Sequence, residues 1–169
     1  MSERTDGRPI PNSYWVVEGQ LLAGEYPGDW EPDEAQARAE AFVHCGFSTF
    51  IDLTEDDELD PYAELVLPAR HRRFPIEDVS VPESTAQTVR ILNAIDSALE
   101  DGERVYVHCH GGIGRTGLVV GCWLVRRLGG REGYRTLQQL WEDCPMSRHT
   151  GTPQTPEQMW YILNWPIGQ

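Results

Sequence analysis

Residues 105–117 read Val-Tyr-Val-His-Cys-His-Gly-Gly-Ile-Gly-Arg-Thr-Gly, and this stretch decides the fold. It begins as a short apolar run typical of a strand, breaks into glycines, and leads into the apolar segment 118–128, which has the character of a helix. A strand, a tight glycine-rich loop and a helix N-terminus form an anion-binding site, because backbone N–H groups converge there and the helix dipole favours negative charge. The glycines lack the Cβ atoms that would stop the backbone from curling round an oxyanion.

Two side chains in this loop carry chemistry. Cys109 lies where the strand ends, and Arg115 lies six residues later at the start of the helix. A cysteine that faces N–H groups and a guanidinium is expected to be a thiolate. The planar fork of Arg115 suits two oxygens of a phosphoryl group. A thiolate nucleophile in a phosphate-shaped loop predicts phosphoryl transfer to the cysteine, followed by hydrolysis.

Other interpretations of the same stretch are weaker. Residues 112–117 match the dinucleotide pattern Gly-x-Gly-x-x-Gly, but that fold needs a second parallel strand about twenty residues on, where this sequence indicates a helix. A Walker loop needs a lysine, and the chain has none. The His-Cys-His run at 108–110 is a poor metal site, because adjacent residues on a strand point to opposite faces. The remaining alternative is a structural glycine-rich turn with a buried cysteine.

The segment 108–116 resembles the Cys-x5-Arg-Ser/Thr signature of the protein tyrosine phosphatase superfamily, and the flanking valine and glycines strengthen the match. The resemblance implies that Cys109 is the nucleophile, that Arg115 holds the phosphoryl oxygens, and that no metal or other cofactor is needed. It also implies that Thr116 donates a hydrogen bond to the departing thiolate and that His108 supports the thiolate form of Cys109. The predicted substrate-binding residues of the loop are His110, Gly111, Gly112, Ile113, Gly114 and Arg115.

The leaving oxygen of a phosphate ester needs a proton. In the phosphatase superfamily this proton comes from an aspartate that is followed four residues later by proline, on a loop upstream of the nucleophile. Asp78 and Pro82 match that pattern, so the resemblance implies that Asp78 is the general acid. Glu77 or Asp52 could substitute for it.

Residues 154–158, Gln-Thr-Pro-Glu-Gln, predict a helix start by themselves, with Thr155 as the N-cap and Pro156 in the first position. They also resemble the Gln-Thr-x-x-Gln loop of tyrosine phosphatases. This resemblance implies that Gln154 orients the water that attacks the cysteinyl phosphate and that Gln158 is a second substrate-binding residue.

The predicted fold is α/β, with a central, mostly parallel twisted sheet, helices on both faces, and an active site at the carboxyl end of strand 104–108. A hairpin of strands 14–17 and 20–23 is expected, then a helix capped by Asp33 that runs to about residue 45, and a strand at 47–53. The other expected elements are a short helix at 62–66, a helix at 85–99 with Ser84 in a capping box, and helices at 118–128, 131–143 and 155–165.

Composition narrows the class of protein. The 169 residues are expected to form a single phosphatase domain, with residues 1–13 as a flexible tail. The net charge of −13 argues against nucleic-acid binding, and no apolar run is long enough to span a membrane. The polar N-terminus and the absence of paired cysteine motifs favour a reducing, cytoplasmic location, and the chain is expected to be a monomer. Three cysteines, at 45, 122 and 144, are interpreted as core residues.

Two charged segments stand out. The acidic run 55–58 is interpreted as a solvated loop rather than a metal site. The basic run 70–73 could lie beside the catalytic loop and attract an anionic substrate, or it could pair with the acidic run. The sequence does not choose between these two positions.

The sequence therefore predicts a cysteine-dependent phosphatase that also loses activity reversibly in peroxide. By resemblance it is closest to compact dual-specificity and prokaryotic-type enzymes. Phosphoinositide phosphatases of the superfamily carry lysines within the loop, where this chain has His110 and Ile113. Phosphoprotein, with phosphotyrosine first, is therefore the expected substrate. The alternatives are an inositol lipid or a small phosphate monoester, and a catalytically inactive phosphate-binding module.

Overall fold

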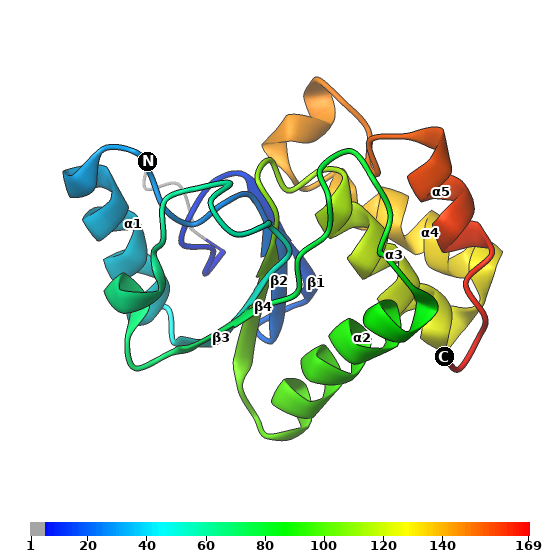
Figure 1. Ribbon diagram of the computed structural model, residues 1–169, viewed down its shortest axis with the longest axis horizontal. Coiled ribbons are helices and arrows are strands. Elements are labelled where there is room, and N and C mark those ends of the chain that lie inside the picture. Colours follow the sequence, from blue (N-terminus) through cyan, green and yellow to red (C-terminus); the bar gives the residue numbers. More distant parts are fainter. Residues whose placement is uncertain (1–5) are drawn as a thin grey trace.

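The computed structural model describes residues 6–169, and this part contains a five-stranded sheet with helices packed around it (Figure 1). No helix within this range has the length and the apolar character needed to cross a membrane. In chain order, the elements are β1 (Ser13–Val17), β2 (Leu21–Gly24), α1 (Pro32–His44), β3 (Phe47–Asp52), η1 (Ala63–Val66), β4 (Arg70–Arg73), α2 (Thr85–Glu100), β5 (Arg104–His108), α3 (Arg115–Leu128), α4 (Gly130–Trp141), η2 (Pro145–Arg148) and α5 (Pro156–Leu163).

Strand β5 lies at the centre of the sheet, whose order is β1-β2-β5-β3-β4. It pairs in parallel with β2 and β3, β3 pairs in parallel with β4, and β1 is antiparallel to β2. Helix α1 covers one face of the sheet and α2 to α5 lie on the other (Figure 1). The predicted α/β fold with a mostly parallel central sheet is therefore confirmed. Because the parallel strands end at one edge, the loops after β2, β3 and β5 meet there.

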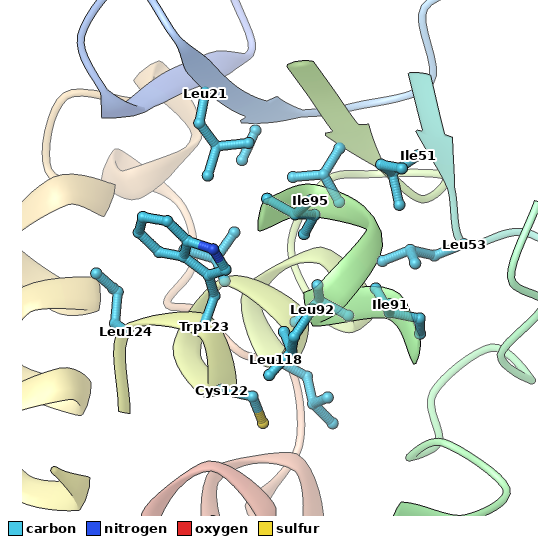
Figure 2. Packing of buried hydrophobic residues seen from close by; sticks show 14 of the residues in the cluster. Leu21, Ile51, Leu53, Ile91, Leu92, Ile95, Leu118, Cys122, Trp123 and Leu124 are labelled. Carbon is cyan, nitrogen blue, oxygen red and sulfur yellow. The ribbon is translucent and has the colours of Figure 1, made fainter. Parts of the chain in front are cut away.

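Alternate side chains of the central strands pack on opposite faces. On one face, Ile51 of β3 lies in a buried cluster with Ile95 of α2 and Leu118 of α3 (Figure 2). On the other, Tyr106 of β5 packs against Phe42 of α1, with 4.6 Å between ring centroids. Burial on both faces fixes β5, and with it the position of the glycine-rich loop that follows.

The sequence predicted two of the helix caps correctly. The side chains of Ser84 and Thr155 each accept a hydrogen bond from the backbone N–H three residues later, at 3.1 Å in both cases. The prediction that Asp33 caps α1 is wrong. That helix begins at Pro32 with Glu31 as its N-cap. Asp33 lies in the first turn, where its negative charge interacts favourably with the helix dipole.

Two features of the fold differ from the prediction. Strand β4 was not expected, because Arg-His-Arg-Arg has no alternation of apolar and polar residues. It is an edge strand whose backbone pairs with β3. Helix α3 begins at Arg115, the residue predicted at the helix start, and so includes three residues before the expected apolar helical segment 118–128.

The prediction that residues 1–13 form a flexible tail is wrong for the residues just before β1 and for Ser13, the first residue of β1. Ile10 is 3% exposed and packs with the core cluster on the α1 face of the sheet. Arg8 donates from Nη1 to the carbonyl of Ser13 at 2.5 Å, and Ser13 already belongs to β1. Residues 1–5 of that prediction lie outside the described residues.

Candidate active site

The loop between β5 and α3 forms the floor of a cavity of about 240 Å³ at the carboxyl edge of the sheet. Cys109 follows β5 directly and is 3% exposed. The side chains of Arg115, Asp78 and Gln154 come to the same cavity from three further segments of the chain. The full set of residues around it is Asp78, Cys109, His110, Gly111, Ile113, Gly114, Arg115 and Gln154.

The shape of the loop depends on Gly112. Its backbone has a φ of +74°, and a Cβ there would lie 2.6 Å from the backbone nitrogen of Glu25 and closer still to the backbone of Gly24. The loop is also held from this side by the backbone N–H of Tyr26, which donates to the carbonyl of His110 at 2.9 Å. Gly112 was predicted to bind substrate. It does not line the cavity, and it instead allows the loop to pack closely on the segment after β2.

Replacing Gly112 by alanine is therefore expected to destabilise the protein by about 2–5 kcal/mol, because a strained φ and a clash with backbone act together. Gly102→Ala is a matched control, since Gly102 has a φ of +78° but nothing within 4 Å of its Cβ position. Gly102→Ala should lower the free energy of unfolding only by the conformational strain, about 1 kcal/mol. Urea denaturation of both variants measures the difference. Equal losses would show that the close approach at Gly112 does not matter.

Arg115 is 1% exposed and is held by a carboxylate from a distant loop. Its Nη2 and Nη1 donate to the two carboxylate oxygens of Glu58 at 2.6 and 2.9 Å, and Nη1 also donates to the carbonyl of Ile76 at 3.0 Å. Burial alone would lower the pKa of Arg115, but the hydrogen bonds with Glu58 and the nearby Cys109 raise it. The same hydrogen bonds lower the pKa of Glu58. Arg115 is thus a fixed, permanent cation at the cavity.

Glu58 was not predicted as a residue of the site. The acidic run 55–58 was interpreted as solvated, and for Glu58 this is wrong, because its carboxylate is bound to a buried guanidinium. No local pattern marks it, since 57 residues separate the two partners. The only available signal was indirect: an arginine buried in a phosphate loop requires a carboxylate partner somewhere in the chain.

Two buried polar atoms beside the cavity, Arg115 Nε and Thr116 Oγ1, have no hydrogen-bond partner among residues 6–169. Buried donors are normally hydrogen-bonded, so both atoms are free to donate to a group that enters the site. Glu58 occupies both terminal nitrogens of Arg115 and leaves its Nε–H available to donate. Thr116 itself is fully buried and does not line the cavity.

Of the three acids considered as proton donors, Asp78 lines the cavity. Its Oδ1 lies 3.2 Å from Nη2 of Arg115 and also accepts from the backbone N–H of Val79 at 2.9 Å. Val79 is exposed and has a φ of +60°, a strained conformation for a β-branched residue. Glu77 is exposed outside the cavity, and Asp52 is buried behind it.

The predicted water-positioning residue, Gln154, lines the cavity, whereas Gln158 does not. Gln158 is fully buried, and its Oε1 accepts from the backbone N–H of Gln154 at 3.0 Å. Its Nε2 donates to the carbonyl of Ser80 at 2.9 Å. Gln158 thus lies outside the cavity, and its amide joins the Gln154 segment to the loop that carries Asp78.

His108 lies beneath the loop and is fully buried, outside the cavity. Its Nδ1 lies 2.9 Å from the carbonyl of Cys109, which can only accept, so Nδ1 carries the proton. Nε2 then accepts from the hydroxyl of Tyr62 at 2.6 Å. Burial lowers the pKa of His108 and raises that of Tyr62, which keeps both groups neutral. The bonds fix the backbone at the nucleophile.

The basic run 70–73 meets the acidic run 55–58, the second of its two predicted positions, through a single ion pair of Arg73. Arg73 binds Asp56 of the acidic run at 2.7 Å and Asp52 at 3.1 Å. His71 lies 2.8 Å from the same Asp52. Burial would raise the pKa of Asp52, but hydrogen bonds from His71 and Thr54 and the charge of nearby groups lower it strongly. Asp52 is thus held as a carboxylate by this network and does not serve as a proton donor at the cavity.

This network predicts a pH dependence of stability. Because the pKa of Asp52 is lower in the folded state than the value of about 3.9 in an unfolded chain, its contribution is complete near neutral pH and is lost as the pH falls below about 5. Asp52→Asn should be less stable than wild type at pH 7 by about 3 kcal/mol, and its free energy of unfolding should fall less steeply as the pH is lowered. Asp56→Asn is the control, since Asp56 binds the same Arg73 but is 87% exposed. Parallel pH curves for wild type and Asp52→Asn in urea denaturation would contradict this account.

Comparisons with known proteins agree with this geometry. A sequence profile described as "Polymorphic toxin system, DSP-PTPase phosphatase" matches residues 28–129. Among curated proteins, "Putative tyrosine phosphatase 067L" of Invertebrate iridescent virus 3 is 31% identical over 119 residues, which is 69% of this chain and 46% of that protein. "Putative tyrosine phosphatase 197R" of Invertebrate iridescent virus 6 is 33% identical over 116 residues, 66% of this chain and 41% of that protein. This chain thus spans somewhat under half the length of these relatives.

A solved structure gives a similar result. The "Crystal structure of Tk-PTP in the active form" superposes with a TM-score of 0.71 at 26% identity, over 90% of this chain and 94% of that one. The matched range of the family profile includes the loop with Asp78 and the complete loop from Cys109 to Arg115. The resemblance inferred from the sequence is confirmed, and the chain belongs to the DSP-PTPase phosphatase family.

Proposed function

We propose that this protein is a cysteine-dependent phosphatase that hydrolyses phosphate monoesters, with phosphotyrosine in proteins as the first substrate class. The observation that carries the proposal is that Cys109 and the fixed guanidinium of Arg115 line one cavity with Asp78. The cavity therefore offers a nucleophile, a cation for phosphoryl oxygens and an acid within one small volume. The proposed steps use only these residues together with Gln154 and the loop backbone.

In the first step, Sγ of Cys109 attacks phosphorus, and the S–P bond forms as the P–O bond to the alcohol or phenol breaks. Asp78 gives its proton to the departing oxygen. Backbone N–H groups of the loop residues that line the cavity, together with the Nε–H of Arg115, hold the phosphoryl oxygens while charge develops on them. Glu58 keeps the guanidinium in place, so little reorganisation is needed when the phosphoryl group arrives.

In the second step, water attacks the cysteinyl phosphate. Gln154 orients this water, Asp78 takes its proton, and the P–S bond breaks to release inorganic phosphate and the Cys109 thiolate. Thr116 lies at the start of α3 with an unpartnered, buried hydroxyl and can donate to that thiolate. Gln158 acts indirectly, because it bonds to both loops that supply Gln154 and Asp78.

We also propose that the protein acts in the cytoplasm as a monomer. All four cysteines, at positions 45, 109, 122 and 144, are thiols rather than disulfides, which suits a reducing compartment.

The substrate class is tested with matched substrates under one set of conditions. A phosphotyrosine peptide, the same peptide with phosphothreonine, and a dispersed phosphoinositide are each incubated with the wild-type protein, and released phosphate is measured. We expect the highest kcat/KM on the phosphotyrosine peptide. Highest kcat/KM on the lipid would favour the phosphoinositide alternative. No turnover of any substrate, with tight phosphopeptide binding, would identify an inactive binding module.

A further inference from the structure

A second cavity, of about 260 Å³, lies beside the catalytic one, and His110 lines both. It is formed by the segment that follows β2 and by the end of the acidic loop after β3. Its volume is below the roughly 300–1,000 Å³ of sites for drug-sized ligands, so it suits a single side chain. The residues around it are Glu25, Tyr26, Gly28, Asp29, Trp30, Arg38, Leu59, Asp60 and His110.

The carboxylates of this second cavity are only partly neutralised. The charge of Glu25 is balanced by Arg38 at 3.2 Å, and the same guanidinium donates to the carbonyl of Tyr26 at 2.7 Å. Asp29 and Asp60 form no ion pair within residues 6–169, although Asp29 accepts a backbone N–H. Burial and the nearby Asp60 raise the pKa of Tyr26, which is consistent with a negative potential here. The cavity therefore carries unbalanced negative charge.

An aromatic ring completes this cavity. Trp30 is 80% exposed, more than any other large apolar side chain in the described range. Core packing therefore does not explain its position. A Trp face beside carboxylates is a favourable environment for an arginine or lysine, whose stem packs on the ring while its charge meets the carboxylates and the π system.

We propose that this second cavity is a specificity subsite, formed by Tyr26, Asp29, Trp30 and Asp60, that binds a positively charged side chain of a phosphorylated polypeptide near its phosphorylated residue. This inference rests on the phosphatase function proposed above. His110 joins the subsite to the catalytic cavity, so phosphate and cation bind side by side. The chain has a net charge of −13, which repels an anionic substrate, and a cation in the substrate offsets that repulsion. A second phosphate, as on a polyphosphorylated inositol, would instead meet two unpaired carboxylates.

The test compares phosphotyrosine peptides that differ at one flanking position, which carries arginine, alanine or glutamate in turn, scanned through the three residues on each side. We expect the wild type to prefer arginine over glutamate at one or two of these positions by about tenfold in kcat/KM. The preference should shrink as ionic strength rises from about 0.01 M to about 1 M. Hydrolysis of a small aryl phosphate is measured in parallel, because it reports the catalytic cavity alone.

The double variant Asp29→Asn, Asp60→Asn is expected to reduce the arginine-to-glutamate ratio to below about threefold, and Trp30→Ala should reduce it by a smaller factor. The ratio is internal to each variant, so a general loss of activity does not change it. Glu100→Gln removes an exposed carboxylate at the far end of α2 and should keep the full preference.

The outcomes separate the two proposals. Turnover of the aryl phosphate without any charge preference, a preference for glutamate, or better turnover of a phosphoinositide than of every peptide would overturn the subsite and leave the phosphatase intact. An unchanged preference in both the double variant and Trp30→Ala would place the recognition elsewhere and overturn it as well. Absence of turnover on aryl phosphate and peptides alike would reject the phosphatase function, and this inference with it.

Discussion

Cys109→Ser is expected to lower the hydrolysis of a small aryl phosphate by about 10⁴-fold or more, in the presence of excess chelator. Serine keeps the approximate size of the side chain, but its hydroxyl is not ionised at neutral pH and is a much weaker nucleophile than a thiolate. The variant should still fold and bind inorganic phosphate, because the backbone N–H groups and Arg115 are unchanged. Steady-state kinetics and phosphate binding measured by calorimetry check both parts.

The matched control is Cys45→Ser. Cys45 is a half-buried thiol at the C-terminal end of α1, away from the catalytic cavity, so the same chemical change should leave turnover within about twofold of wild type. Equal turnover by Cys109→Ser and Cys45→Ser would show that hydrolysis does not depend on the cysteine of the loop.

Arg115→Lys is expected to lower kcat/KM by about 10²–10³-fold. Lysine keeps the positive charge but lacks the planar fork, so it cannot bind both oxygens of Glu58 and also donate to a phosphoryl oxygen. Glu58→Gln should produce a smaller loss, about tenfold, because the amide keeps one acceptor but not the charge-assisted bidentate pair. Kinetics on the aryl phosphate measure each effect.

Glu55→Gln is the control for this second prediction. Glu55 belongs to the same acidic loop and is exposed, with no ion pair in the described range. If Glu55→Gln and Glu58→Gln had equal effects, the loop would act only through its general charge, and the direct bond from Glu58 to Arg115 would have no role in catalysis.

The site residues that could be predicted from the sequence are those that lie close together in the chain. Cys109, the glycines and Arg115 lie within seven consecutive residues, so their geometry follows from one strand, one turn and one helix start. The sheet was also predictable, because β5 and β3 are short apolar strands between helices. The caps of α2 and α5 follow from single side chains and the residues just after them.

The rest depends on partners that are distant in sequence. Glu58 becomes part of the site only because β3 and β5 are neighbours, which brings the loop after β3 over Arg115. Gln158 matched a family pattern in sequence, yet its two bonds depend on how α5 packs against the loop that carries Asp78. Strand β4 forms because an edge was available beside β3, and its four polar residues give no hydrophobic signal.

The covalent intermediate on Cys109 is tested most directly with Asp78→Asn and para-nitrophenyl phosphate. The para-nitrophenolate leaving group of this substrate needs no proton, so the first step should proceed without Asp78. The second step lacks its base, so phosphate should accumulate on Cys109. The reaction is quenched during turnover and the peptide that contains Cys109 is analysed by mass spectrometry. A two-step reaction through a cysteinyl phosphate predicts a stoichiometric burst of para-nitrophenol and a phosphorylated Cys109. Hydrolysis with no phosphate on Cys109, or with phosphate on another residue, would contradict it.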